Sequence, residues 1–127
     1  MIDFTQTLLG TLDMKFEMVT ADKVVISMPV GPKVHQPYGL LHGGASVALA
    51  ETVASVGAIA NLEEGKQSAV GQEINANHLR PVKEGTITAT GTPIYRGKRS
   101  QVWHIEIKDE AERLICISRC TMAVIDL

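Results

Sequence analysis

The chain begins with short stretches in which apolar and polar residues alternate, and it then changes period. Residues 13–20 and 23–30 predict two strands, the second ending at the helix-breaking run PVGP. From about Gly43 to Ala60 nearly every position is apolar, which predicts one long helix ending near Asn61. Beyond it the period returns to two, and four long strands are expected over residues 68–80, 85–95, 100–109 and 113–125.

This order of elements predicts an α+β fold made of a single domain over residues 1–127. Because the helix has no polar face, we expect a curved antiparallel sheet to wrap it, with its alanines and glycines allowing close approach. The turns KEGT, YRGKRS and DEAER have hairpin-like spacing, so the last four strands are expected to follow one another in antiparallel order. Residues 1–10 are expected to form a short helix or an arm.

Composition narrows the function classes. A content of 45% apolar and 20% charged residues is typical of a globular protein, and a net charge of −2 gives no general attraction to nucleic acid or to an anionic membrane. The uncharged run around the helix is interrupted by Glu51, which argues against a membrane span, and no secretory signal precedes it. Cys116 and Cys120 lie roughly 13 Å apart on one predicted strand, too far for a disulfide. Free thiols favour a cytoplasmic protein.

The segment HQPYGLLHGGASVALAETVAS carries the candidate chemistry. Gly43 and Gly44 open the helix, whose first N–H groups lack internal partners and can hold a developing oxyanion. Glu51 follows two turns later, and Ser55 lies one further turn along the same face. Desolvation in an apolar helix makes a carboxylate a stronger base. Taken alone, Glu51 fits a catalytic group as well as a structural one that pairs with an arginine across an interface or bonds the sheet. The glycine pair at the helix start and the nearby amide and imidazole favour catalysis.

The other candidates also have structural interpretations. His42 fits a site residue or a helix cap, Gln36 fits a site residue or a solvated loop, and Ser55 fits a hydroxyl that bonds back to a helix carbonyl. The loop Tyr95–Ser100 has three cations in four positions, which suits nucleotide phosphates or a solvated turn. Tyr38 with Leu40 and Leu41 suggests an apolar acyl pocket. No metal-binding spacing and no serine-hydrolase elbow occurs in the sequence.

The motifs QPYGLLHGG, AETVAS, GQEINANHLR and RSQVWHIEI together resemble the hotdog-fold acyl-CoA thioesterases. The similarity runs from about residue 12 to the C-terminus. It is strongest to the branch that contains 1,4-dihydroxy-2-naphthoyl-CoA hydrolase, the phenylacetate-pathway thioesterases and the Glu-type 4-hydroxybenzoyl-CoA thioesterase. The resemblance implies hydrolysis of an acyl-CoA, favours an aromatic acyl group, and leaves menaquinone biosynthesis among the possible pathways.

The resemblance also implies roles for individual residues. The amide of Gly43 would polarise the thioester carbonyl, His42 and Gln36 would orient it, and Glu51 would act as nucleophile or general base, with Ser55 placing water or Glu51. Coenzyme A would be bound by Gly71, by His78, Leu79, Arg80 and Pro81, and by Tyr95, Arg96, Gly97, Lys98, Arg99 and Ser100. The HLRP and YRGKRS segments are expected to share one groove. No cofactor or metal beyond the substrate is implied.

The partner implied is a second copy of the chain. A homodimer would face Glu51 of one subunit toward Gly43 of the other, and two dimers would form a homotetramer. Two other functions remain open from the residues: a non-hydrolytic acyl-CoA binding module, which needs no buried carboxylate, and a dehydratase, whose usual His/acid pair fits the glycine-to-glutamate spacing less well.

Overall fold

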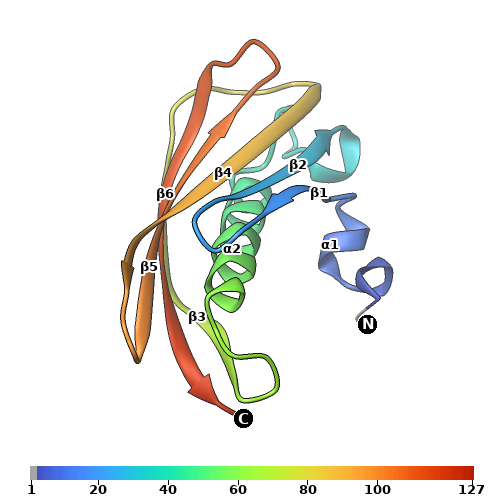
Figure 1. Cartoon of the computed structure of the whole chain (residues 1–127). Helices are drawn as coiled ribbons and strands as arrows, with labels where there is room; N and C mark the ends of the chain where they lie inside the picture. Colours follow the sequence, from blue (N-terminus) through green and yellow to red (C-terminus); the bar gives the residue numbers. More distant parts are fainter. Residues whose placement is uncertain (1–2) are drawn as a thin grey trace.

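The computed structural model describes residues 3–127, and in it one long helix, α2 (Gly43–Ala60), lies against the concave face of a six-stranded antiparallel sheet (Figure 1). Every predicted strand and the helix is present within two residues of its expected bounds. The strands are β1 (Lys15–Val19), β2 (Val24–Val30), β3 (Gln67–His78), β4 (Gly85–Arg96), β5 (Ser100–Lys108) and β6 (Leu114–Asp126). The α+β prediction is therefore confirmed.

An N-terminal arm precedes the sheet. It consists of a 3-10 turn, η1 (Phe4–Gln6), and one turn of helix, α1 (Leu8–Thr11). The Asp3 carboxylate caps η1 by accepting a hydrogen bond from the Thr5 N–H at 2.9 Å. A third short turn, η2 (Pro32–Val34), follows β2. The expected short helix or arm is present, apart from its first two positions, which lie outside the described residues.

The order of strands in the sheet, β1-β2-β4-β5-β6-β3, corrects one prediction. β4 pairs with β5 and β5 pairs with β6, both antiparallel, as their turns predicted. β3 does not pair with β4: it pairs with β6, while β4 lies between β2 and β5. The KEGT segment is therefore part of a crossover from one edge of the sheet to its interior. The hairpin interpretation was wrong here because β4 is paired on both sides, so β3 can bond only to the free side of β6.

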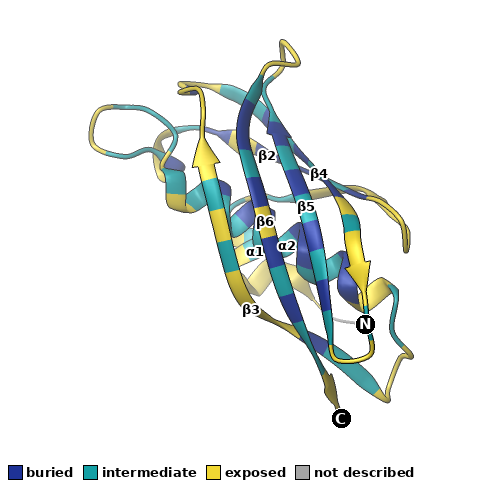
Figure 2. Ribbon diagram, turned by 90° about the vertical axis from the view of Figure 1, so that its left-hand side faces the viewer, coloured by how far each residue is buried: buried dark blue, intermediate teal, exposed yellow. Residues whose placement is uncertain are grey.

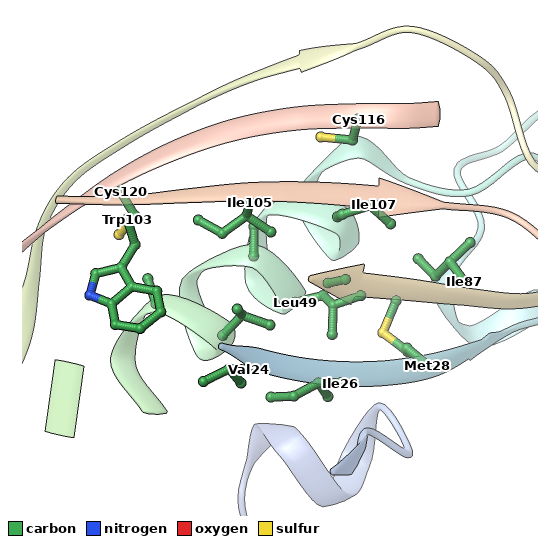
Figure 3. Close-up of a cluster of buried hydrophobic side chains, with 14 of the residues drawn as sticks. Val24, Ile26, Met28, Leu49, Ile87, Trp103, Ile105, Ile107, Cys116 and Cys120 are labelled. Carbon is green, nitrogen blue, oxygen red and sulfur yellow. The ribbon is translucent and has the colours of Figure 1, made fainter. Parts of the chain in front are cut away.

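The core lies between α2 and the sheet, with apolar side chains of β2, β4, β5 and β6 pointing at the helix (Figure 3). Two glycines allow the close approach that the sequence suggested. A Cβ built on Gly57 would lie 2.5 Å from the Trp103 ring, and one on Gly91 would clash with Val53. The Trp103 N–H is not left unpaired, because it donates to Gln101 Oε1 at 2.9 Å.

α2 is long and apolar enough to cross a membrane by length and composition, but one face of it is buried against the sheet. This packing agrees with its interpretation as a core helix. Cys116 and Cys120 are free and buried, as expected. Burial raises the pKa of both thiols, and for Cys120 it is joined by the charges of Glu51 and Glu73, which together bring the pKa to about 12.

The two sheet edges differ. Figure 2 shows buried and partly exposed residues alternating along β5, while β3 is exposed over much of its length. β1 is a short edge of 5 residues, whereas β3 is an edge of 12 residues that bonds only to β6. A long unpaired edge is a template for pairing with another strand.

Candidate active site

The N-terminus of α2 presents one free backbone donor. His42 Nδ1 accepts a hydrogen bond from the Gly44 N–H at 2.8 Å, so the imidazole caps the helix. With Nδ1 as acceptor, the neutral ring carries its proton on Nε2. The N–H of Gly43 bonds to no acceptor within residues 3–127. The cap interpretation of His42 is thus confirmed, and the cap leaves the Gly43 amide available to a ligand.

A pocket of about 360 Å³ opens beside this amide. We call it the amide pocket; its lining includes Gln36, Gly43, Ser46, His78, Leu79, Arg80 and Pro81. The structure therefore brings the predicted oxyanion glycine together with Gln36 and the HLRP segment. The imidazole of His78 packs against Gly43, since a Cβ at Gly43 would lie 2.8 Å from His78 Nε2.

Gln36 is oriented by its own loop. Its Oε1 accepts hydrogen bonds from the Tyr38 N–H at 2.6 Å and the Leu40 N–H at 3.4 Å. The carboxamide oxygen is consequently satisfied, and the side-chain NH₂ group is left to donate to a ligand in the amide pocket. This arrangement suits a group that holds a carbonyl or a thioester sulfur in place.

Glu51 lies in a second, larger pocket of about 560 Å³. We call it the carboxylate pocket; it is lined by Phe4, Leu8, Leu9, Gly44, Val47, Ala48, Glu51, Thr52, Ser55, Val56 and Ile59. Glu51 is half-buried, and no cation within residues 3–127 forms an ion pair with it. No ion pair within the described chain therefore accounts for the charge at Glu51, and a pair across a subunit interface stays a prediction.

The carboxylate of Glu51 rests on β3 at a glycine. A Cβ added to Gly71 would collide with Glu51 Oε2 and would lie 3.1 Å from its Cδ. The pairing of β3 with β6 shifts register between Gly71 and Glu73, which places a β-bulge next to the contact. Bulges are frequent beside active sites, where they redirect side chains. Gly71 thus contacts the predicted catalytic group itself.

Ser55 shares the carboxylate pocket with Glu51, as its spacing predicted. Its hydroxyl has a weak contact of 3.9 Å to Met122 Sδ and no bond to a helix carbonyl within the described residues. The hydroxyl that bonds back to the helix belongs instead to Thr52, which donates to the Ala48 carbonyl at 2.7 Å. Ser55 is therefore free to donate to a ligand.

Gly43 and Glu51 do not meet within one chain. They are eight residues apart on α2, which corresponds to roughly 12 Å along the helix axis. Gly43 lines the amide pocket and Glu51 lines the carboxylate pocket. A base or nucleophile must approach within about 3 Å of its target, so one chain does not present both groups to a single carbonyl.

The basic loop lies at the other end of α2. Arg96 Nη1 donates to Asp22 Oδ1 at 2.8 Å, to the Ala21 carbonyl at 3.2 Å and to Asn61 Oδ1 at 3.2 Å. These bonds tie the β1–β2 turn to the residue that ends α2. Arg96 therefore has a structural role, while Lys98 and Arg99 are exposed and make no ion pair within residues 3–127. Tyr95 folds over Gly97, where a Cβ would collide with its hydroxyl.

The expected common groove for the HLRP and YRGKRS segments does not form within one chain. On β6, Cys116 pairs with His78 and Ala123 pairs with Ser100. Seven residues of strand separate these two points, which is roughly 23 Å. A ligand that contacts both segments of one chain would have to be extended over about this distance.

The N-terminal arm is the part of the site that the sequence did not reveal. Phe4, Leu8 and Leu9 line the carboxylate pocket, whereas Tyr38 is 89% exposed and Leu40 and Leu41 line the amide pocket. The only local signal for this role of the arm was the helical spacing of Phe4, Leu8 and Leu9. From residue 3 onward, no group of three or more His, Cys, Asp or Glu side chains is arranged to hold a metal ion.

Comparison with known proteins gives consistent matches. Residues 38–116 match the family model described as the thioesterase superfamily. The chain is 50% identical over 114 residues to 1,4-dihydroxy-2-naphthoyl-CoA hydrolase of Listeria monocytogenes, covering 90% of this chain and 92% of that protein. Thioesterase HI1161 of Haemophilus influenzae superposes with a TM-score of 0.93 at 45% identity, covering 98% of this chain and 86% of that one.

A Staphylococcus aureus thioesterase, SAV0944, is 46% identical, with a TM-score of 0.90, and the match covers 92% of this chain and 97% of that one. That structure carries a glutamine-to-alanine substitution. A second structure of the same protein carries a glutamate-to-alanine substitution. The two substituted positions are as far apart in that protein as Gln36 and Glu51 are here.

Proposed function

The chain belongs to the thioesterase superfamily and has its hotdog fold, and from this we propose that it hydrolyses an aromatic acyl-CoA with Glu51 as the catalytic carboxylate. The observation that carries the proposal is the position of Glu51. The carboxylate is half-buried among apolar side chains, has no cation beside it among the described residues, and is held against Gly71. A carboxylate without a counter-charge is available to act on a substrate as nucleophile or general base.

The proposed active site is shared between two subunits. The amide of Gly43 in one subunit would hold the thioester oxygen, and Glu51 of the other would approach the carbonyl carbon. The distance between Gly43 and Glu51 along α2 supports this arrangement, because the two residues of one chain are too far apart to act on the same carbonyl. β3 offers the means of association, since its free edge of 12 residues can pair with the same edge of a second copy. Two such dimers would form the expected homotetramer.

In this arrangement the roles of the remaining groups follow from their contacts. Gln36 would donate its NH₂ group to the thioester from the amide pocket, and His42 would hold the helix end that carries the Gly43 amide. Lys98 and Arg99 of one subunit and Arg80 of another would meet the coenzyme A phosphates. Glu51 would either attack the carbonyl and expel the coenzyme A thiolate, forming an anhydride that water then hydrolyses to the free acid, or remove a proton from a water that attacks the carbonyl as the carbon–sulfur bond breaks and coenzyme A leaves.

We infer that the acyl group is 1,4-dihydroxy-2-naphthoyl, with a role in menaquinone biosynthesis in the cytoplasm. The name of the Listeria monocytogenes relative, at 50% identity, supports the substrate. The two buried free thiols support a reducing compartment. A non-hydrolytic acyl-CoA binding module is less well supported, because it would not need a carboxylate without a counter-charge in its acyl pocket.

The substitution Glu51→Gln tests the proposal. It keeps the size of the side chain and removes its charge, so kcat on 1,4-dihydroxy-2-naphthoyl-CoA or benzoyl-CoA should fall by about 10²–10⁴-fold, as for loss of a general base. The affinity for coenzyme A, measured by calorimetry, should stay within about twofold. Glu64→Gln, at an exposed glutamate in the turn before β3, is the matched control. Near-normal turnover by Glu51→Gln would refute the catalytic role.

A further inference from the structure

The N-terminal arm (Phe4–Thr11) lies on the side of α2 that faces away from β4, β5 and β6 (Figure 1). Three of its apolar side chains, Phe4, Leu8 and Leu9, line the carboxylate pocket. Phe4 is 44% exposed and Leu8 is 56% exposed, so the arm leaves apolar surface uncovered beside Glu51. Exposed apolar surface that lines a pocket next to a reactive group is a feature of ligand sites.

We propose that the arm forms the outer wall of the acyl pocket and selects bulky, ring-bearing acyl groups over short ones. This inference rests on the proposed function, since it assigns the acyl end of the same substrate. The occupant follows from the position of the carboxylate: a carbonyl that Glu51 attacks has its acyl chain within a few ångströms, and the adjoining space is lined by apolar residues of α2 and the arm. A short acyl group would fill less of this space than a ring would.

The chemistry of the pocket refines this class of substrate. Its walls are aliphatic apart from the ring of Phe4, and its hydroxyls are those of Thr52 and Ser55. Thr52 already donates to the Ala48 carbonyl, whereas Ser55 has only a weak contact with sulfur. Ser55 can therefore donate to a polar substituent on the acyl ring. A flat apolar group with an oxygen substituent near its attachment to the carbonyl satisfies these features.

The arm is fixed well enough to act as a wall. The Leu12 N–H donates to the Leu8 carbonyl and the Met14 N–H to the Leu9 carbonyl, each at 2.9 Å, and the side chains of Leu12 and Met14 pack on the core. The ring of Phe4 lies 5.4 Å from that of Phe16 on β1. Gly10 sets the spacing between η1 and α1, because a Cβ there would lie 2.5 Å from the Thr5 Cα.

Two substitutions test the wall. Leu8→Ala removes apolar surface from the pocket, and Gly10→Ala pushes η1 away from α1 without changing a residue of the pocket lining. Both should lower kcat/KM for 1-naphthoyl-CoA by about 10-fold or more, and both should leave kcat/KM for acetyl-CoA within about twofold. Leu127→Ala is the matched control, because it makes the same change at an exposed leucine outside the pocket.

Binding measurements separate this inference from the proposed hydrolysis. The thioether analogue of 1-naphthoyl-CoA lacks a cleavable bond, and its affinity relative to coenzyme A should fall about 10-fold in Leu8→Ala but not in Leu127→Ala. That result supports the wall even if the wild-type protein hydrolyses no thioester. Equal losses for the naphthoyl and acetyl substrates would overturn it, as would an unchanged ratio of affinities. A shift of Leu8→Ala to monomers with equal losses would identify the pocket as a subunit contact.

Discussion

The carboxylate of Glu51 occupies the space in which a side chain at Gly71 would stand. Only glycine at this position of β3 lets the helix side chain lie flat on the strand. The obstacle is Oε2, at the end of a flexible side chain, and not backbone. A methyl group at Gly71 would therefore displace the carboxylate while leaving the fold almost unstrained. Substitution of Gly71 thus tests whether the position of the Glu51 carboxylate matters while the carboxylate itself is retained.

We predict that Gly71→Ala lowers kcat by about 10²-fold, the cost that a misplacement of 1 Å can have, while the midpoint of thermal unfolding changes little. Gly31→Ala is the matched control, since nothing lies within 4 Å of a Cβ there and its backbone is extended. Steady-state kinetics and thermal unfolding of the two variants check this. Normal turnover by Gly71→Ala would mean that the contact does not position Glu51.

A second glycine contact involves the oxyanion amide. A Cβ at Gly43 would lie 2.8 Å from His78 Nε2, so Gly43→Ala must move either the imidazole or the start of α2. If the helix start moves, the amide leaves its position, and the loss of one such donor costs about 10²–10³-fold in kcat.

The double variant Gly43→Ala/His78→Ala distinguishes these alternatives, because it removes the obstructing ring. We expect its kcat at saturating substrate to exceed that of Gly43→Ala alone, although KM for the acyl-CoA rises through the loss of His78. A double-mutant cycle measures the coupling between the two residues. Purely additive losses would show that the imidazole does not limit the position of the amide.

The sequence predicted the elements of the fold more completely than their arrangement. α2 begins and ends where it was expected because its signals are local: Gly43 and Gly44 follow the capping His42, and Asn61 ends the helix. The pairing of β3 with β6 depends on which strand edges are free after the rest of the sheet has formed. That information is not contained in the turn KEGT, so its interpretation as a hairpin was wrong.

In the candidate site, too, the residues with a local sequence signal were predicted, whereas the contacts between distant segments were not. Gly43 and Glu51 were found because a glycine pair at a helix start and an acid in an apolar helix are visible in the sequence. The role of Arg96 was not visible, because its partners Asp22 and Asn61 lie 74 and 35 positions away along the chain. The wall formed by Leu8 likewise depends on how the arm packs on α2. Contacts between distant segments decide both.

The basic loop should consequently divide into a structural and a ligand-binding part. Arg96→Ala removes three hydrogen bonds at the end of α2, and we expect a modest loss of stability, about 1 kcal/mol or less, because Arg96 and Asp22 are exposed. Arg99→Ala should instead raise KM for the acyl-CoA several-fold without changing stability. Urea unfolding and kinetics of both variants test this division, with Lys15→Ala as an exposed cationic control.

If Arg99→Ala leaves KM unchanged at low salt, the loop does not bind the phosphates. Ionic strength gives an independent measurement, because contacts between exposed cations and phosphate are screened by salt. KM of the wild-type protein should rise with salt, and the slope should be smaller for Arg99→Ala than for Lys15→Ala. Equal slopes for the two variants would contradict the assignment.

The buried thiol of Cys120 gives stability a dependence on alkaline pH. Burial, followed by the charges of Glu51 and Glu73, raises its pKa from 9.0 to about 12 in the folded protein. The folded state therefore keeps a proton that the unfolded state releases between pH 9 and about 12. The contribution is fully present below pH 9 and is lost as the pH rises toward 12. Stability should decline across this window.

Cys120→Ala isolates the effect, because every other titrating group is common to both proteins. Its free energy of unfolding, measured by urea at intervals from pH 8 to pH 11, should start lower because of the lost packing but decline less steeply than that of the wild type. Glu51→Gln should also reduce the slope, because it removes one of the two charges that raise the pKa. Parallel slopes for wild type and Cys120→Ala would show that the thiol is not held protonated. An unchanged slope in Glu51→Gln alone would show that the Glu51 carboxylate lies too far from Cys120 for its charge to act on the thiol.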